Sequence, residues 1–197
     1  MDSEPVGWLG LAVMAAAFAA FLVYLVTAKR RGEAGPAETG AVRSRRSLLG
    51  IAVQGVAFAV ASFGPIRIFV GPLGSVQLAQ AALIAGLMAV ALGLFVSASR
   101  TMGRNWSFVA RTRQDHQLVQ DGPFAHVRHP IYVALFLYLV ALAVALGHPR
   151  HLLLAIPIFA LGTWLRIAEE ERLLRAAFGP AYDAYAARVK RFVPGLF

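Results

Sequence analysis

Long runs of apolar residues, separated by short polar stretches, dominate the pattern of the chain. A run of roughly 20 apolar residues can cross a bilayer as an α-helix. The pattern predicts five helices, at about residues 6–28, 48–70, 76–98, 131–146 and 152–165. The last two runs are the shortest, so each fits either a tilted span or a buried hairpin.

Glycine and proline mark where these helices are predicted to end. Gly64-Pro65 interrupts the second run, so its helix is expected to end near Phe63. The connector GHPRH between the last two runs is short enough for an antiparallel helical hairpin. The polar stretch of residues 30–46 is rich in Gly, Ala and charge, which predicts a flexible loop.

The composition favours a membrane protein. Of the 197 residues, 58% are hydrophobic and 15% are charged, whereas a soluble domain has about 25% charged residues. The absence of cysteine excludes disulfides, thiolate metal sites and a cysteine nucleophile. We therefore predict an all-α integral membrane protein with about five transmembrane helices, the last two a short hairpin, and a cytoplasmic C-terminal helical tail. The length suits one domain, residues 1–197, with a transmembrane scaffold (1–99) and a half that carries the chemistry (100–197).

The formal net charge of +9 is explained by the membrane rather than by nucleic acid. The basic residues gather at the ends of the apolar runs, where they set orientation and meet anionic headgroups. The loops after the first and third runs and the C-terminal tail are basic, so all three are expected to face the cytoplasm. The Ala- and Arg-rich composition indicates a bacterial source, so the predicted location is a multi-pass protein of the inner membrane.

Three polar stretches would share that cytoplasmic face, at residues 104–107, 116–132 and 166–185. Each alone has an ordinary explanation, such as an interfacial tryptophan, a proline-initiated helix or a surface pair between Arg166 and Glu170. Together they indicate more. The helix start at Arg128-His129-Pro130 suits a carboxylate or phosphate, and three glutamates at a membrane helix end require a protein-lined polar cavity. This pairing predicts a zwitterionic, amino-acid-like ligand.

The order of the motifs resembles the isoprenylcysteine carboxyl methyltransferase family. The elements are R-N-W-S, H-x-L-V-x-x-G-P-F-x-x-V-R-H-P-x-Y, R-I-x-x-E-E-x-x-L, F-G-x-x-Y-x-x-Y and V-x-x-F-V-P, over roughly residues 100–197. Phospholipid N-methyltransferases share the broader pattern. The resemblance implies an integral membrane enzyme that uses S-adenosylmethionine (SAM) in a cytoplasmic pocket and methylates a lipophilic acceptor arriving from the bilayer.

The resemblance also assigns roles to residues of this chain. The residues expected to bind SAM are His116, Val119, Gly122, Phe124, Arg128, His129, Tyr132 and Glu170. Those expected to take part in the chemistry are Arg166, Glu170 and Glu171, and those expected to meet the acceptor are Asn105, Trp106 and Arg166. Phe124 stands where the family more often has tyrosine, so a hydroxyl contact is lost there.

The methyl acceptor remains open at this point. A carboxylate of an isoprenoid-like or other lipid needs no base, and Arg166 could orient it through a charge-assisted pair. A phospholipid amine would need one of the three glutamates to take a proton. Arg166 slightly favours the carboxylate.

Two other interpretations are weaker. Membrane sterol reductases resemble the same C-terminal half and bind NADPH there, but they are usually much longer. A membrane scaffold or metal-handling protein would use the five histidines, His116, His126, His129, His148 and His151. Because these are predicted on both sides of the membrane, no metal site is expected. The oligomeric state does not follow from the sequence.

Overall fold

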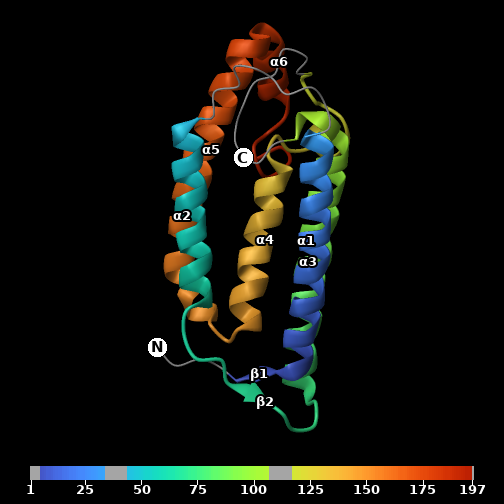
Figure 1. Cartoon of the computed structure of the whole chain (residues 1–197), viewed down its shortest axis with the longest axis vertical. Coiled ribbons are helices and arrows are strands. Elements are labelled where there is room, and N and C mark those ends of the chain that lie inside the picture. The colour runs from blue at the N-terminus through green and yellow to red at the C-terminus, as the bar shows by residue number, and fades with distance from the viewer. Residues whose placement is uncertain (1–4, 34–43, 107–116, 197) are drawn as a thin grey trace.

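The protein is an elongated bundle of long helices with a short helix at one end (Figure 1). The computed structural model describes residues 5–33, 44–106 and 117–196. The helices are α1 (Trp8–Glu33), α2 (Arg45–Ser62), α3 (Ser75–Met102), α4 (Pro130–Ala145), α5 (Leu152–Phe178) and α6 (Pro180–Arg188). Short 3-10 helices are η1 (Gly103–Asn105), η2 (Gly122–Ala125) and η3 (Pro149–His151).

Local sequence accounts for several of the helix ends. The Ser44 hydroxyl accepts a hydrogen bond from the Ser47 amide at 3.3 Å and so caps α2. This helix stops at Ser62, which confirms the predicted end near Phe63 before Gly64-Pro65. Pro130 occupies the first position of α4, where its missing N–H costs nothing.

The fifth helix is longer than the hydropathy predicts. It runs without a break from Leu152 past Pro157 to Phe178, which agrees with the expected placement of Arg166 and Glu170 on one helix and extends it well beyond them. The apolar run stops at about residue 165, but the following Glu, Arg, Leu and Ala residues are strong helix formers. Gly179, at φ +51°, finally ends α5, and Pro180 begins α6.

The helices pair differently from a simple hairpin. The most extensive packing joins α2 with α5, α3 with α4, and α1 with α3. The consecutive helices α4 and α5 meet chiefly near their short connector, where both pack on α2. The buried residues of that cluster are Ala57, Ala61, Leu139, Ala143, Ala155 and Phe159. The last two helices therefore start as a hairpin, and α5 then follows α2.

Two glycines set the crossing of α2 and α5. A Cβ built on Gly50 would lie 2.8 Å from the Gly162 carbonyl oxygen and 2.5 Å from Arg166 Cγ. A Cβ built on Gly162 would lie 2.8 Å from the Gly50 carbonyl oxygen. The two backbones thus touch at a point where no side chain fits.

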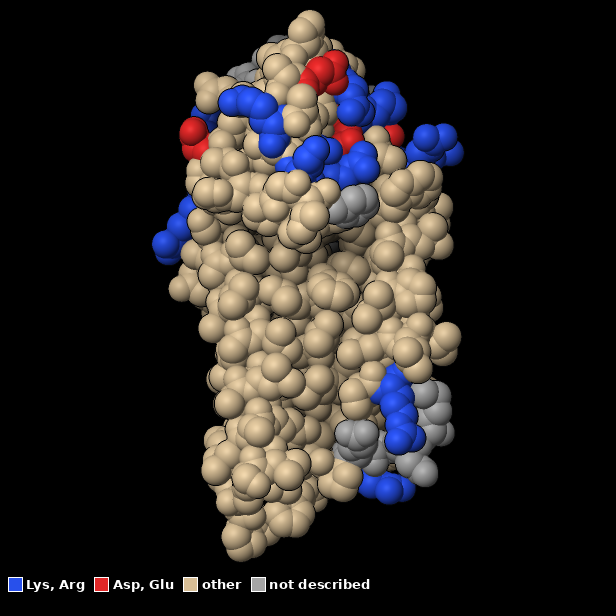
Figure 2. Space-filling view, turned by 180° about the vertical axis from the view of Figure 1, so that it is seen from behind, with Lys and Arg blue, Asp and Glu red and all other residues tan. Residues whose placement is uncertain are grey.

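Length and composition mark three segments as able to cross a bilayer, namely Trp8–Gly32, Ser75–Met102 and Pro149–Phe178. The apolar α4 is shorter, with 16 residues. The structure therefore supports a multi-pass membrane protein, but the predicted count of five spans is not confirmed. Figure 2 shows the matching surface, with a broad uncharged band and most charged side chains gathered at one end.

A small strand pair closes the opposite end of the bundle (Figure 1). β1 (Val6–Gly7) runs parallel to β2 (Ile68–Phe69), in the register Val6 with Ile68. The pair joins the start of α1 to the segment between α2 and α3. The sequence did not predict it.

Candidate functional site

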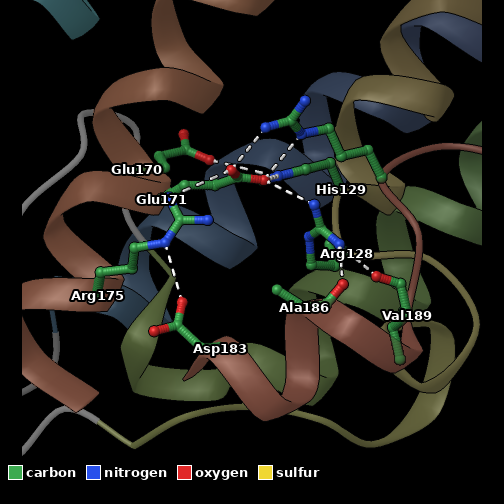
Figure 3. A network of polar contacts seen from close by, with 9 residues as sticks. Arg128, His129, Glu170, Glu171, Arg175, Asp183, Ala186 and Val189 are labelled. Carbon is green, nitrogen blue, oxygen red and sulfur yellow. Dashed lines mark hydrogen bonds and ion pairs between the residues drawn. The ribbon is translucent and has the colours of Figure 1, made fainter. Parts of the chain in front are cut away.

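The site lies at the charged end of the bundle, where four parts of the chain meet. The start of α4 and the C-terminal half of α5 lie beside α6 and a C-terminal strap, defined as residues 189–192 (Figure 3). The strap pairs with the backbone before α4. The Arg128 amide donates to the Lys190 carbonyl at 2.8 Å, and the His129 amide donates to the Arg191 carbonyl at 3.0 Å. Motifs about 60 residues apart are thereby held together.

Glu171 is the centre of the polar network (Figure 3). Its side chain is 2% exposed. Oε1 accepts from Arg128 Nη2 at 3.1 Å and from Arg191 Nε at 3.0 Å, and it lies 3.2 Å from His129 Nε2. Oε2 accepts from Arg191 Nη2 at 2.8 Å and lies 3.8 Å from Arg175 Nη1. Basic side chains from α4, α5 and the strap thus converge on one buried carboxylate.

Arg128 connects this carboxylate with α6. Its Nη1 atom donates to the Ala186 carbonyl at 2.8 Å and also to the Val189 carbonyl. The same guanidinium therefore neutralises Glu171 and satisfies carbonyls at the C-terminal end of α6, an arrangement that a planar fork of donors allows.

Glu170 faces a more open environment than Glu171. The Tyr132 hydroxyl donates to its Oε1, and its Oε2 lies 3.8 Å from His129 Nδ1. The Glu170 side chain is 27% exposed, whereas that of His129 is 5% exposed. His129 thus stands between the two glutamates, and Glu170 keeps a surface on which a ligand can bind.

Arg166 is held from the side by α2. Its Nη1 atom donates to Gln54 Oε1 at 3.0 Å, and Gln54 Nε2 donates to Thr163 Oγ1 at 2.8 Å. The guanidinium carbon lies 5.1 Å from the centre of the Tyr132 ring, which is a cation–π contact. Tyr132 therefore links Arg166 to Glu170.

Gln54 is a site residue that the sequence analysis missed. It lies buried in the apolar α2. An amide side chain is costly in lipid, so a lone glutamine within an apolar run is expected to face a polar partner inside the protein. That expectation could have identified Gln54 from the sequence. Arg191 was also missed, because it occupies a variable position of the V-x-x-F-V-P motif.

The segment before α4 carries the other predicted SAM-binding residues. Phe124 is buried in η2, and its carbonyl accepts from the Tyr185 hydroxyl at 2.7 Å. Gly122 has φ +57°, and a Cβ there would lie 2.7 Å from Thr101 Oγ1, so glycine is required. Val119 is half-buried just before η2, and His116 lies outside the described residues.

Two of the three residues predicted near the acceptor, Asn105 and Trp106, lie on the α1–α3 side of the bundle, apart from Arg166. Trp106 is buried, and its ring stands edge-on to Phe95, with ring centroids 6.5 Å apart. It packs in a cluster with Ala28 and Ala134. Asn105 ends η1. The structure thus groups Arg128, His129, Tyr132, Arg166, Glu170 and Glu171, and it places Trp106 in a hydrophobic cluster.

Burial raises the pKa of Tyr182 in α6 to about 12, and two other groups in the C-terminal part of the chain have shifted pKa values. Burial raises the pKa of Tyr185 to about 12, so its hydroxyl stays protonated and donates to Phe124. Hydrogen bonding to Glu171 raises the pKa of Arg191 above its ordinary value. The Tyr185–Phe124 and Arg191–Glu171 hydrogen bonds hold the C-terminal residues on the site.

The sequence has matches among characterised families. Residues 81–176 match the sequence model of the isoprenylcysteine carboxyl methyltransferase (ICMT) family. The protein-S-isoprenylcysteine O-methyltransferase of Schizosaccharomyces pombe is 33% identical over 115 residues, covering 55% of this chain and 47% of that protein. The cobalt-zinc-cadmium resistance protein CzcN of Cupriavidus metallidurans is 35% identical over 109 residues, covering 53% of this chain and 49% of that protein. The chain thus spans about half the length of these curated relatives.

A solved structure has the same fold. The eukaryotic intramembrane Ras methyltransferase ICMT superposes with a TM-score of 0.54 at 21% identity, covering 95% of this chain and 68% of that one. The similarity in fold therefore extends over the first half of the chain, where the motifs gave no resemblance beyond hydrophobicity.

Proposed function

Because the resemblance of this chain to the isoprenylcysteine carboxyl methyltransferase family is confirmed in sequence and in fold, we propose that it is a SAM-dependent membrane methyltransferase acting on a lipophilic acceptor. One observation carries the proposal. Within the matched residues, Tyr132, His129 and Glu170 form a partly exposed polar group where α4 begins, and the strap pairs with the backbone beside it.

The chemistry of these residues suits SAM. The half-open Glu170 carboxylate can accept hydrogen bonds from ribose hydroxyls or from the ammonium group of an amino acid. The backbone at Gly122 comes so close to Thr101 that only glycine fits, which lets η2 lie flat against the end of α3. SAM would be held between η2, the start of α4 and Glu170, and it supplies an electrophilic methyl group when bound.

Alignment is the main task left to the protein. Arg166 can hold an acceptor carboxylate through two parallel hydrogen bonds. Gln54 and the Tyr132 ring fix the guanidinium before the acceptor arrives, so little ordering is needed on binding. The apolar faces of α2 and α5 keep water away from the reacting groups. If the acceptor were an amine, Glu170 is the carboxylate placed to take its proton.

Glu171 has a different role in this proposal. Its oxygens already accept from Arg128 and Arg191 and lie within reach of His129, so it acts as a positioning residue. It fixes the ring of His129 toward Glu170 and fastens the strap beside them.

The distribution of Lys and Arg between the two ends of the bundle supports a cytoplasmic site. Among the described residues, Arg67 and Arg150 are the only Lys or Arg side chains at the β1–β2 end of the bundle. Positive residues stay in the cytoplasm during insertion. We therefore assign the α6 end to the cytoplasm, where SAM is available.

Ligand titration tests the proposal. Purified protein in detergent is titrated with SAM and with NADPH, and SAM is expected to saturate. His129→Ala and Glu170→Ala are each expected to weaken SAM at least tenfold, about 1.4 kcal/mol. Glu169→Ala is the matched control, because Glu169 pairs with Arg172 on the same helix. Saturable NADPH binding without SAM binding would replace the proposal by a reductase.

The acceptor is found by product analysis. Lipid extract is incubated with the protein and isotopically labelled SAM, and the labelled lipid is identified by mass spectrometry. A methyl ester is expected. A labelled amine would assign the reaction to nitrogen instead.

A further inference from the structure

A second hollow lies on the outside of the bundle, between α1 and α3. It has a volume of about 580 Å³, within the roughly 300–1,000 Å³ of small-ligand pockets. Its lining residues are Tyr24, Leu92, Gly93, Val96, Ser97, Arg100 and Thr101. None of these residues belongs to the group around Glu170, although Thr101 also lies against Gly122 of η2.

The hollow runs along the helix axis from an apolar part to a charged part. Gly93 is exposed, and a Cβ built on it would meet nothing within 4 Å, so the floor of the hollow is open. Arg100 lies seven residues further on, about 10 Å along the axis. Leu92 and Val96 provide apolar walls below it.

The charged part of the hollow is placed at headgroup depth. With 28 residues, α3 is about 42 Å long, which exceeds the roughly 30 Å of a bilayer's hydrocarbon core. Arg100 is exposed in its last turns, beside the hydroxyls of Ser97 and Thr101. The apolar residues one to two turns earlier then lie at the depth of the acyl chains.

The electrostatics favour an anion. No Asp or Glu occurs in α3, and α1 contributes Lys29, Arg30 and Arg31 at the same end, with Glu33 as its one acidic residue. A guanidinium binds a phosphate through paired hydrogen bonds, and basic residues near the surface attract anionic lipids.

We propose that this hollow binds one anionic phospholipid of the leaflet at the α6 end. Its phosphate lies on Arg100 beside the Ser97 hydroxyl, and one acyl chain passes Val96 and Gly93 toward Leu92.

Native mass spectrometry tests the site with two probes that share the phosphate and the acyl chains and differ in the headgroup alcohol, so that one is anionic and the other zwitterionic. Phosphatidylglycerol and phosphatidylcholine with identical acyl chains are titrated into the purified protein. Wild type is expected to retain one phosphatidylglycerol with about fivefold preference over phosphatidylcholine. Gly93→Leu fills the hollow and is expected to abolish retention of this lipid.

Two further variants keep the test decisive. Gly86→Leu is the matched control, because Gly86 is also exposed on α3 with nothing within 4 Å of a built Cβ, yet it does not line the hollow. It is expected to bind like wild type. Arg100→Gln is expected to bind both lipids equally, and it supplies the answer if Gly93→Leu does not fold. Equal retention by Gly93→Leu and Gly86→Leu, or an unchanged preference in Arg100→Gln, would overturn the proposal.

Discussion

Replacing Glu171 by glutamine keeps the shape of the side chain and removes the charge on which the network converges. Arg128, whose side chain is 10% exposed, then loses its buried counter-charge, and the buried His129 ring loses a carboxylate hydrogen-bond partner. Removing one partner of a buried ion pair costs about 3–5 kcal/mol, because the other charge stays buried without compensation. Arg191 and Arg175 are 39% and 49% exposed, so water screens them and they add under about 1 kcal/mol.

Thermal unfolding followed by circular dichroism in a fixed detergent measures this cost. For a chain of this size, about 1 kcal/mol corresponds to about 2–4 °C, so Glu171→Gln is expected to lower the unfolding midpoint by about 6–20 °C. SAM affinity is expected to fall as well, because His129 and the strap lose their common anchor.

Glu169→Gln supplies the comparison, since it makes the same chemical change two residues earlier on α5. Its ion-pair partner, Arg172, is 60% exposed, so a cost of about 1 kcal/mol or less is expected. If the two variants unfold at the same temperature, the network around Glu171 does not stabilise the protein, and its positioning role is refuted.

Three other expectations follow from the same geometry. Arg166→Ala and Arg166→Lys should keep SAM affinity within a few-fold and lose turnover by about 10²-fold. Side-by-side SAM titrations and methyl-transfer rates measure both effects. If the variants turn over at the wild-type rate, Arg166 serves only to anchor the end of the helix. Tyr185→Phe should cost about 1 kcal/mol in thermal unfolding through its lost bond to Phe124, and an unchanged midpoint would contradict this. In this cysteine-free chain, Leu196→Cys should resist an impermeant thiol reagent in intact cells while Arg150→Cys reacts; labelling of position 196 would reverse the proposed topology.

Local signals in the sequence predicted the parts of the fold that depend on near neighbours. Gly64-Pro65 ended α2, and Pro130 began α4, because both residues act through their own backbone. The sequence placed His129 and Glu170 at opposite ends of one polar pocket, whereas the structure brings His129 Nδ1 within 3.8 Å of Glu170 Oε2. The cost of carboxylates in lipid indicated a shared pocket but not the distance between the two side chains.

Contacts between distant residues were beyond such reasoning. Gln54 and Arg166 are 112 residues apart in the sequence. No local pattern around either residue predicts that the two side chains are in contact. The β1–β2 pair is two residues long, too short for an alternating pattern. The C-terminal end of α5 was not predicted for another reason, since hydropathy reports where a chain stops being apolar and not where it stops being helical.

The close contact between Gly50 and Gly162 is a point about which α5 can pivot against α2. Backbones that touch without side chains between them can rotate about that point more easily than they can separate. Glu171 lies nine residues beyond Gly162, about 13 Å along the helix, so a rotation of about 5° displaces it by about 1 Å. A shift of that size is enough to change a reaction rate about 10²-fold. We therefore expect bilayer thickness, which affects how steeply long helices tilt, to change the position of the carboxylates at the far end of α5.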